Sequence, residues 1–205
     1  MRLVLQLPAV LTAFVLAACG GQAADDQAEH GPGGATHTGT ATTAAATGQV
    51  DRAFVAAMVP HHEAAIEMAR LAQGRARSSF VRDLARGIAR SQRAEVATMR
   101  SRDRALAAQG AQAGDLGVPH HAMGMDDDPA QLRDAADVDE AFLTMMVPHH
   151  EGAIAMARAE LARGTDPALR RLAATIARDQ AREVRTMRRH LDGDHRGGEH
   201  AAEGH

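Results

Sequence analysis

Apolar residues recur three and four positions apart in four stretches of this 205-residue chain. That spacing places them on one face of an α-helix, so the pattern predicts helices over about 51–73, 79–107, 139–163 and 167–193. Asp128-Pro129 predicts the start of a further short helix. Aromatic residues make up only 2 % of the chain, which favours helix over sheet. The sequence therefore predicts an all-α protein.

The second pair of predicted helices repeats the first. Met58-Val-Pro-His-His-Glu63 reappears as Met146-Val-Pro-His-His-Glu151, so His149 follows His61 by 88 positions, and the offset holds into the next helix. One helix pair cannot bury its own apolar face, whereas two pairs together can. We therefore predict a four-helix bundle over residues 50–192, with repeats over about 51–107 and 138–192 and a linker over 108–137.

The two ends of the chain lack this pattern. Residues 1–18 combine a basic start with a short apolar run, which is typical of a signal peptide. Leu16-Ala-Ala-Cys19 resembles a bacterial lipoprotein box, in which Cys19 is lipidated; an ordinary cleaved signal is the alternative. Either predicts export, to the outer face of the cytoplasmic membrane or the periplasm. The composition of residues 19–49 predicts a disordered tether, and that of residues 193–205 predicts a disordered tail that contains histidine.

Paired histidines lie on the core face of a predicted helix in each repeat. On a helical projection, His61 and His62 fall on the apolar face and Glu63 falls off it. Buried imidazoles need partners for their nitrogens, so four of them predict a polar site inside the bundle. The site either binds a metal or is a structural hydrogen-bond network. Its other polar members, on the facing helices, are Gln92, Glu95, Gln180 and Glu183, which in a metal site would orient the imidazoles.

Methionines on the same helix faces favour copper among the metals. Thioether sulfur is a poor ligand for magnesium, calcium or manganese and favours Cu(I), while imidazole suits copper and zinc. A single methionine is usually core filler, but here histidine and methionine coincide in both repeats. They coincide again in the linker, where a candidate auxiliary metal site comprises His120, His121, Met123 and Met125.

Enzyme motifs are incomplete in this chain. His62-Glu63 begins like the zinc-protease motif His-Glu-x-x-His, but Ile66 and Ile154 stand at the second ligand position. A di-iron site uses two Glu-x-x-His motifs, and this chain offers too few inward carboxylates, which leaves a di-metal oxidase as a weaker alternative. No nucleophile arrangement or phosphate loop is present. The net charge of −3 gives no reason to expect a nucleic-acid partner.

Taken together, Met-Val-Pro-His-His-Glu-x-Ala-Ile-x-Met-Ala and Ile-Ala-Arg-x-Gln-x-x-Glu-Val-x-x-Met resemble the bacterial family called domain of unknown function 305. The resemblance covers about residues 51–191 and implies a ferritin-like four-helix bundle in an exported protein. Some members bind copper through methionine and histidine. The metal ligands it implies here are Met58, His61, His62, Met68, Met99, Met146, His149, His150, Met156 and Met187.

We therefore predict an exported, membrane-anchored protein that binds copper, with Cu(I) favoured, as a chaperone or sequestering protein for metal tolerance. It would exchange ligands with a copper-transfer protein and would not be an enzyme. The alternative from another class is a structural or interaction bundle whose core histidines are hydrogen-bonded. The sequence leaves open whether the two histidine pairs form one site or two.

Overall fold

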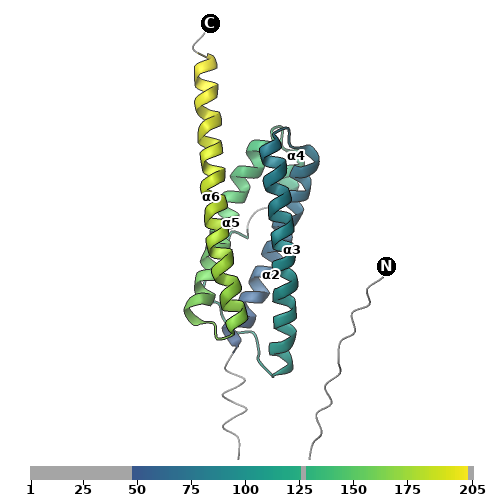
Figure 1. Cartoon of the computed structure of the whole chain (residues 1–205), viewed down its shortest axis with the longest axis vertical. Coiled ribbons are helices and arrows are strands. Elements are labelled where there is room, and N and C mark those ends of the chain that lie inside the picture. The colour runs from purple at the N-terminus through teal and green to yellow at the C-terminus, as the bar shows by residue number, and fades with distance from the viewer. Residues whose placement is uncertain (1–47, 126–127, 203–205) are drawn as a thin grey trace, which may run out of the picture. The chain divides into compact units, whose positions relative to one another are not determined.

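The computed structural model describes residues 48–125 and 128–202, with side chains through residue 193 (Figure 1). The predicted signal peptide, Cys19 and nearly all of the predicted tether lie outside the described residues. The helices are α2 (Gln49–Arg75), α3 (Ser79–Ala108), α4 (Pro129–Asp134), α5 (Val138–Arg163) and α6 (Pro167–Ala202), with a 3-10 turn η1 (His120–Ala122). The described residues contain no strand. The prediction of an all-α, four-helix bundle is confirmed.

The helix bounds agree closely with the sequence pattern except at the C-terminal end. Helix α6 runs to Ala202, past the predicted stop near Gly193 and through most of the predicted disordered tail. An interior glycine costs about 1 kcal/mol relative to alanine but does not by itself end a helix. Pro60 and Pro148 lie inside α2 and α5, so neither helix begins at its proline. A kink at these prolines stays a prediction.

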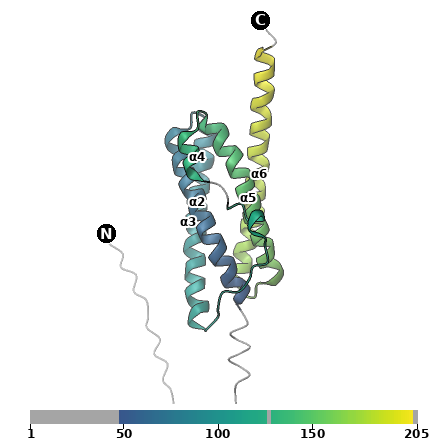
Figure 2. The same cartoon turned by 180° about the vertical axis from the view of Figure 1, so that it is seen from behind.

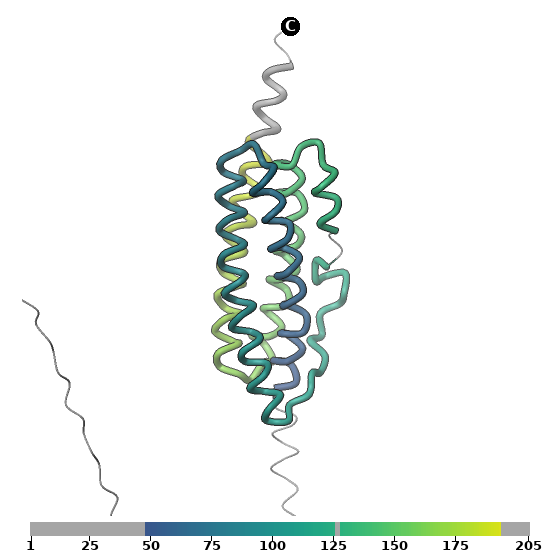
Figure 3. The backbone as a smooth tube through the Cα atoms, turned by 90° about the vertical axis from the view of Figure 1, so that its right-hand side faces the viewer, coloured from purple at the N-terminus to yellow at the C-terminus, as the bar shows by residue number. Residues whose placement is uncertain are grey.

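The four long helices lie side by side (Figures 1 and 3). Helix α2 packs along α3, and α5 packs along α6, which are the two helix pairs seen in the sequence repeat. The pairs meet chiefly through α2 and α5, whereas α3 and α6 touch at few positions. The bundle is therefore tightly closed on its α2–α5 side and more open between α3 and α6.

The repeats are joined by two equivalent carboxylates. The Asp51 carboxylate accepts hydrogen bonds from the backbone N–H groups of Thr165 (3.0 Å) and Asp166 (2.6 Å), in the loop before α6. Asp139 accepts from the N–H groups of Arg77 (2.9 Å) and Ser78 (3.1 Å), before α3. Each helix start thus binds the hairpin loop of the other repeat, which fixes the two pairs in one register.

The linker between the repeats returns along the α2–α5 side of the bundle (Figures 2 and 3). Its Gly114 N–H donates to the carbonyl of Gln49 at the start of α2, at 3.0 Å. Further along, Gly124 adopts φ +63° against the backbone of Pro148 and His149. Helix α4 then packs on α2 and α5. The linker therefore covers the seam between these two helices.

The apolar core consists of two clusters, one towards each end of the bundle. We call them the Met58 cluster and the Met68 cluster. The Met58 cluster includes Phe54, Met58, Met99, Met156 and Ile176. The Met68 cluster includes Met68, Ile88, Phe142, Met146 and Met187. On α2, α3 and α6, a polar segment separates the residues that belong to one cluster from those of the other. On α5 the paired histidines do so, except that Ile154 joins the Met68 cluster from beyond Ala153. None of the described helices is long and apolar enough to cross a membrane.

Candidate metal centre

A layer of polar side chains lies between the two apolar clusters, at mid-height of the bundle. We call it the polar layer. It consists of His61 and His62 from α2, Gln92 and Glu95 from α3, His149 and His150 from α5, and Gln180 and Glu183 from α6. All four histidines and both glutamines are buried, and the two glutamates are partly exposed. The structure thus brings both predicted histidine pairs into one place.

The inner pair of the polar layer meets where α2 crosses α5. The ring centroids of His61 and His149 are 3.6 Å apart, with their planes tilted by 34°. None of their four ring nitrogens makes a hydrogen bond of good geometry among the described residues, although the backbone of Met123 and of His149 lies near enough to His61 to oppose the effect of burial on its pKa. An unpaired buried polar group costs about 1–3 kcal/mol, so the folded chain alone leaves this pair unsatisfied.

The inner histidines are neutral at pH 7. Burial, assisted by the neighbouring His62 and His150, lowers the pKa of His61 to about 3. Burial and the adjacent His61 also lower the pKa of His149 far below its ordinary value. A neutral imidazole carries one nitrogen lone pair. Each inner ring can therefore donate to a soft cation without first losing a proton.

The outer histidines are held by the glutamates. His62 Nε2 lies 2.7 Å from Glu95 Oε2, and His150 Nε2 lies 2.8 Å from Glu183 Oε2. A carboxylate accepts hydrogen bonds, so Nε2 is the donor in each pair, and in the neutral ring the lone pair resides on Nδ1. Both Nδ1 atoms are buried without a partner. The geometry gives Glu95 and Glu183 the orienting contact that the sequence predicts for them.

The two glutamines do not complete a hydrogen-bond network. The amide oxygen and nitrogen of Gln92 and Gln180 are buried and have no partner in the described part of the chain. A structural network therefore accounts for the outer histidines but leaves the inner histidines and both glutamines unexplained.

The predicted methionine ligands are buried and divide into two sets. All six have 0 % exposure. Met58, Met99 and Met156 lie in the Met58 cluster, and Met68, Met146 and Met187 lie in the Met68 cluster, so each set draws on both repeats. Within the described residues, no group of three or more His, Cys, Asp or Glu side chains is arranged to hold a metal ion.

The linker histidines and methionines lie outside the polar layer. His120 and His121 are exposed on η1, and Met123 and Met125 are half-buried. Met123 packs on the Met58 cluster, and its backbone carbonyl lies against Gly152 of α5. A Cβ at position 152 would collide with that carbonyl, which explains why glycine stands here while the first repeat has Ala64. The linker thus closes the polar layer from the α2–α5 side.

One buried carboxyl escaped the sequence analysis. Glu160 of α5 is fully buried near Asp51, and its oxygens have no hydrogen-bond donor among the described residues. Burial and the neighbouring Asp51 carboxylate raise the pKa of Glu160 to about 8. Burial opposes ionisation of Asp51 as well, but hydrogen bonds from Asp166 and Thr165 outweigh it and keep the pKa of Asp51 below its ordinary value. One sequence feature could have indicated it: Glu160 stands at the position equivalent to Ala72, an apolar residue of the first repeat.

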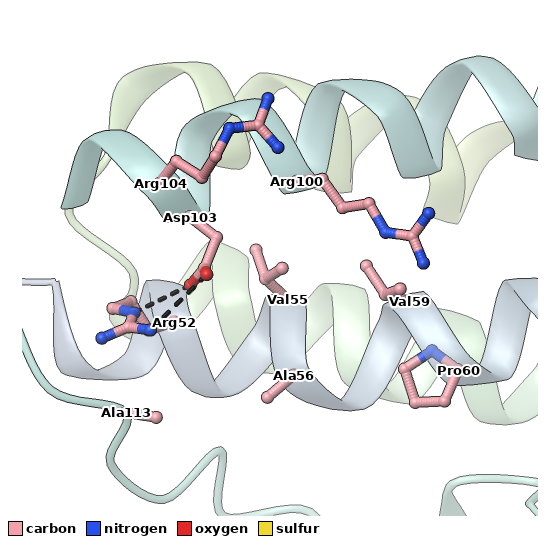
Figure 4. Close-up of a pocket in the computed structure, with 9 residues that line it drawn as sticks. All are labelled: Arg52, Val55, Ala56, Val59, Pro60, Arg100, Asp103, Arg104 and Ala113. Atoms are coloured by element: carbon pink, nitrogen blue, oxygen red, sulfur yellow. Dashed lines mark hydrogen bonds and ion pairs between the residues drawn. The ribbon is translucent and has the colours of Figure 1, made fainter. Parts of the chain in front are cut away.

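A pocket of about 320 Å³ lies between α2 and α3, and no residue of the polar layer lines it (Figure 4). Arg52, Arg100 and Arg104 line it together with Asp103, whose carboxylate pairs with Arg52 at 2.8 Å. It contains no histidine or methionine, and three guanidinium groups against one carboxylate disfavour a cation. This pocket is not part of the candidate metal centre.

Comparison with known families and structures agrees with this description. Residues 51–191 match the family described as Domain of unknown function (DUF305), and an overlapping match covers residues 16–102. Among curated proteins, none matches this sequence.

Solved structures similar to this chain include metal-bound forms. CopM in its Cu(I)-bound form is 28 % identical, with a TM-score of 0.60, over 70 % of this chain and 96 % of CopM; CopM has also been solved in Cu(II)- and Ag-bound forms. A DUF305 fragment from Deinococcus radiodurans is 32 % identical, with a TM-score of 0.58, over 70 % of this chain and 95 % of the fragment. A Streptomyces coelicolor DUF305 protein, assigned as secreted, is 26 % identical, with a TM-score of 0.58, over 68 % and 90 % of the chains.

Proposed function

The chain belongs to the domain of unknown function 305 family, and from that premise we propose that it binds copper, chiefly Cu(I), in the polar layer of its bundle. The observation that carries the proposal is the inner pair, His61 and His149. Their four nitrogens are buried, unpartnered and on neutral rings. The copper- and silver-bound forms of CopM support the choice of metal.

The residues present fit a soft cation. His62 and His150 present unpartnered Nδ1 lone pairs because Glu95 and Glu183 bind their Nε2–H groups. Methionines stand above and below the layer, Met58 and Met146 each one helical turn before a histidine pair. Imidazole and thioether together favour Cu(I) over harder ions. The copper is cargo here, held by neutral donors and given up by ligand exchange.

We further propose that the protein is exported and held at the membrane through lipidated Cys19, as a copper chaperone or sequestering protein and not an enzyme. The likeness to a DUF305 protein assigned as secreted supports export. Labelling cells with a fatty-acid analogue tests the anchor: the native chain should incorporate the label, and a Cys19→Ser variant should not. Label on the variant would contradict the assignment.

The binding proposal is tested by an anaerobic Cu(I) titration of the full chain against a competing chelator. A variant with His61, His62, His149 and His150 all changed to Ala should lose tight binding. His120→Ala/His121→Ala, which alters only the linker, should keep it. If the four-histidine variant bound Cu(I) as tightly as the native chain, the copper site would be assigned to the linker instead. Circular dichroism establishes that each variant is folded.

The structural alternative rests on the His62–Glu95 and His150–Glu183 hydrogen bonds and predicts a different thermal response. A ligand that binds only the folded state stabilises it by about 2.7 kcal/mol at a hundredfold excess over Kd. We expect Cu(I) to raise the melting temperature of the native chain. An unchanged melting temperature would favour the structural alternative.

A further inference from the structure

A cleft of about 230 Å³ opens between α3 and α6, on the loosely packed side of the bundle. Its lining includes the four polar-layer residues that these helices supply, Gln92, Glu95, Gln180 and Glu183. The cleft therefore leads from solvent to Glu95 and Glu183, the glutamates that bind the buried outer histidines.

Two carboxylates connect solvent to the buried imidazoles within this cleft. The Glu95 and Glu183 side chains are 15 % and 27 % exposed, whereas the His62 and His150 side chains to which they bind are 0 % exposed. Gln92 and Gln180 lie deeper, almost fully buried, with both amide atoms unpartnered. Polar groups without protein partners, lining a cleft, are what a hydrated or partly dehydrated ion needs along its path.

The carboxylates of the cleft divide into a paired one at the rim and two deeper ones. The lining holds Glu95, Asp179 and Glu183 against the guanidinium groups of Arg90 and Arg182. At the rim, Asp179 is paired with both Arg178 (2.9 Å) and Arg182 (3.0 Å). The deeper charges in the cleft are the two glutamates, which focus a negative potential towards the polar layer.

The opposite side of the layer is closed. There the linker packs directly on α5, with Met123 against Gly152 and Gly124 against His149. An ion approaching from that side would have to displace this backbone, whereas the α3–α6 side needs no such movement.

We propose that the α3–α6 cleft is the route by which a soft monovalent cation reaches and leaves the polar layer, with Glu95 and Glu183 as the residues that attract it. The proposal rests on the proposed function and adds a route and a charge selection to it. The glutamates are positioning residues: each also fixes the tautomer of the histidine behind it.

The first test requires no copper binding. Gln92→Cys places a thiol inside the cleft, and Ala89→Cys places one a turn earlier on α3, buried in the Met68 cluster and outside the cleft. Both are made in the full chain with Cys19→Ser, which removes its single natural thiol. A small cationic methanethiosulfonate should modify Gln92→Cys at least tenfold faster than Ala89→Cys. Equal rates would overturn the route.

The charge selection is tested in the same protein. The cationic reagent should outpace an anionic reagent of similar size at Gln92→Cys, and Glu95→Gln with Glu183→Gln should remove that preference. An unchanged preference would assign it to other groups and overturn the role given to the glutamates.

The second test addresses copper itself. Ser91→Cys at the cleft, labelled with a bulky maleimide, should slow Cu(I) uptake and release at least tenfold and leave the equilibrium affinity within about threefold. Ala97→Cys, exposed on the same helix but lining the α2–α3 groove, is the labelled control and should change neither. Uptake at the native rate by labelled Ser91→Cys would overturn the proposal. If the native chain did not bind Cu(I) at all, the proposed function would be refuted. The thiol-modification experiment would still test the route, because it does not depend on copper.

Discussion

His61 and His149 occupy equivalent positions in the two repeats, and their rings lie 3.6 Å apart across the α2–α5 contact. Equivalent residues of a repeat meet in this way when they lie close to the axis that relates the two copies. Because the two rings share this position, we interpret the polar layer as one central site formed by both repeats. The outer histidines, each bound to its own glutamate, flank that centre.

Replacing the inner histidines should separate binding from folding. Because neither ring has a hydrogen-bond partner, His61→Leu with His149→Leu removes unsatisfied buried groups, and apolar replacement of such groups is neutral or stabilising. We expect the metal-free variant to be as stable as the native chain, or more stable by up to about 2 kcal/mol. Urea denaturation measures this. A loss above about 1 kcal/mol would show that the inner pair makes a structural contribution.

Replacing an outer histidine should have the opposite effect on stability. His62→Leu leaves the Glu95 carboxylate partly buried without its donor, a change that costs about 1–3 kcal/mol. The same urea experiment compares the two kinds of variant. Equal effects at inner and outer positions would contradict the division of roles between them.

The stability of the bundle should fall as the pH rises from 6.5 to 8.5. The folded-state pKa of Glu160 is raised from its ordinary 4.5 to about 8, so the folded state holds a proton there that the unfolded state has released. Stability from this group is complete below about pH 4.5 and is lost as the pH rises through 8. His61 and His149 act in the opposite direction at the lower end of this range, because the unfolded chain, with the ordinary histidine pKa of 6.5, still protonates them while the folded chain does not. Their effect fades above about pH 7.5, where the Glu160 effect alone remains.

Glu160→Gln should remove this pH dependence. The neutral amide replaces the protonated carboxyl, so at pH 8.5 we expect the variant to exceed the native chain by on the order of 2–4 kcal/mol. Glu140→Gln, exposed near the start of the same helix, is the matched control and should follow the native curve. A native curve that is flat between pH 6.5 and 8.5 would be incompatible with the buried, protonated Glu160.

The linker should come loose when Gly152 acquires a side chain. A methyl group there collides with the Met123 carbonyl, so Gly152→Ala should raise hydrogen exchange in residues 117–125 at least tenfold. Ala64→Gly changes the equivalent position in α2 and is the control. Unchanged protection of the linker in Gly152→Ala would show that it is held mainly by other contacts.

The sequence predicts the bundle well because its information is local and repeated. Helical spacing and the 88-residue offset locate α2, α3 and α5, and the projection places all four histidines inside. Helix α6 is the exception, since glycines near its end weaken a helix without stopping it. The pairing of Glu95 with His62, and of Glu183 with His150, agrees with their predicted orienting role.

What the sequence could not supply is the arrangement between repeats. Helical periodicity says which face of α2 is buried but not which residue of α5 it meets, so the contact of His61 with His149 was open. For the same reason, the sequence could not predict that the methionines divide into two clusters, each with members from both repeats. The raised pKa of Glu160 could not be predicted, because it depends partly on Asp51, which is distant in sequence.

The most direct test of a copper centre built from both repeats is X-ray absorption spectroscopy of the Cu(I)-loaded full chain. We expect a spectrum fitted by imidazole nitrogen together with thioether sulfur, and a smaller imidazole contribution in His61→Leu with His149→Leu, which keeps only the outer histidines. A copper spectrum without imidazole would place the ion outside the polar layer, and one that the double substitution leaves unchanged would place it away from the inner pair; either result would contradict a copper centre shared by both repeats.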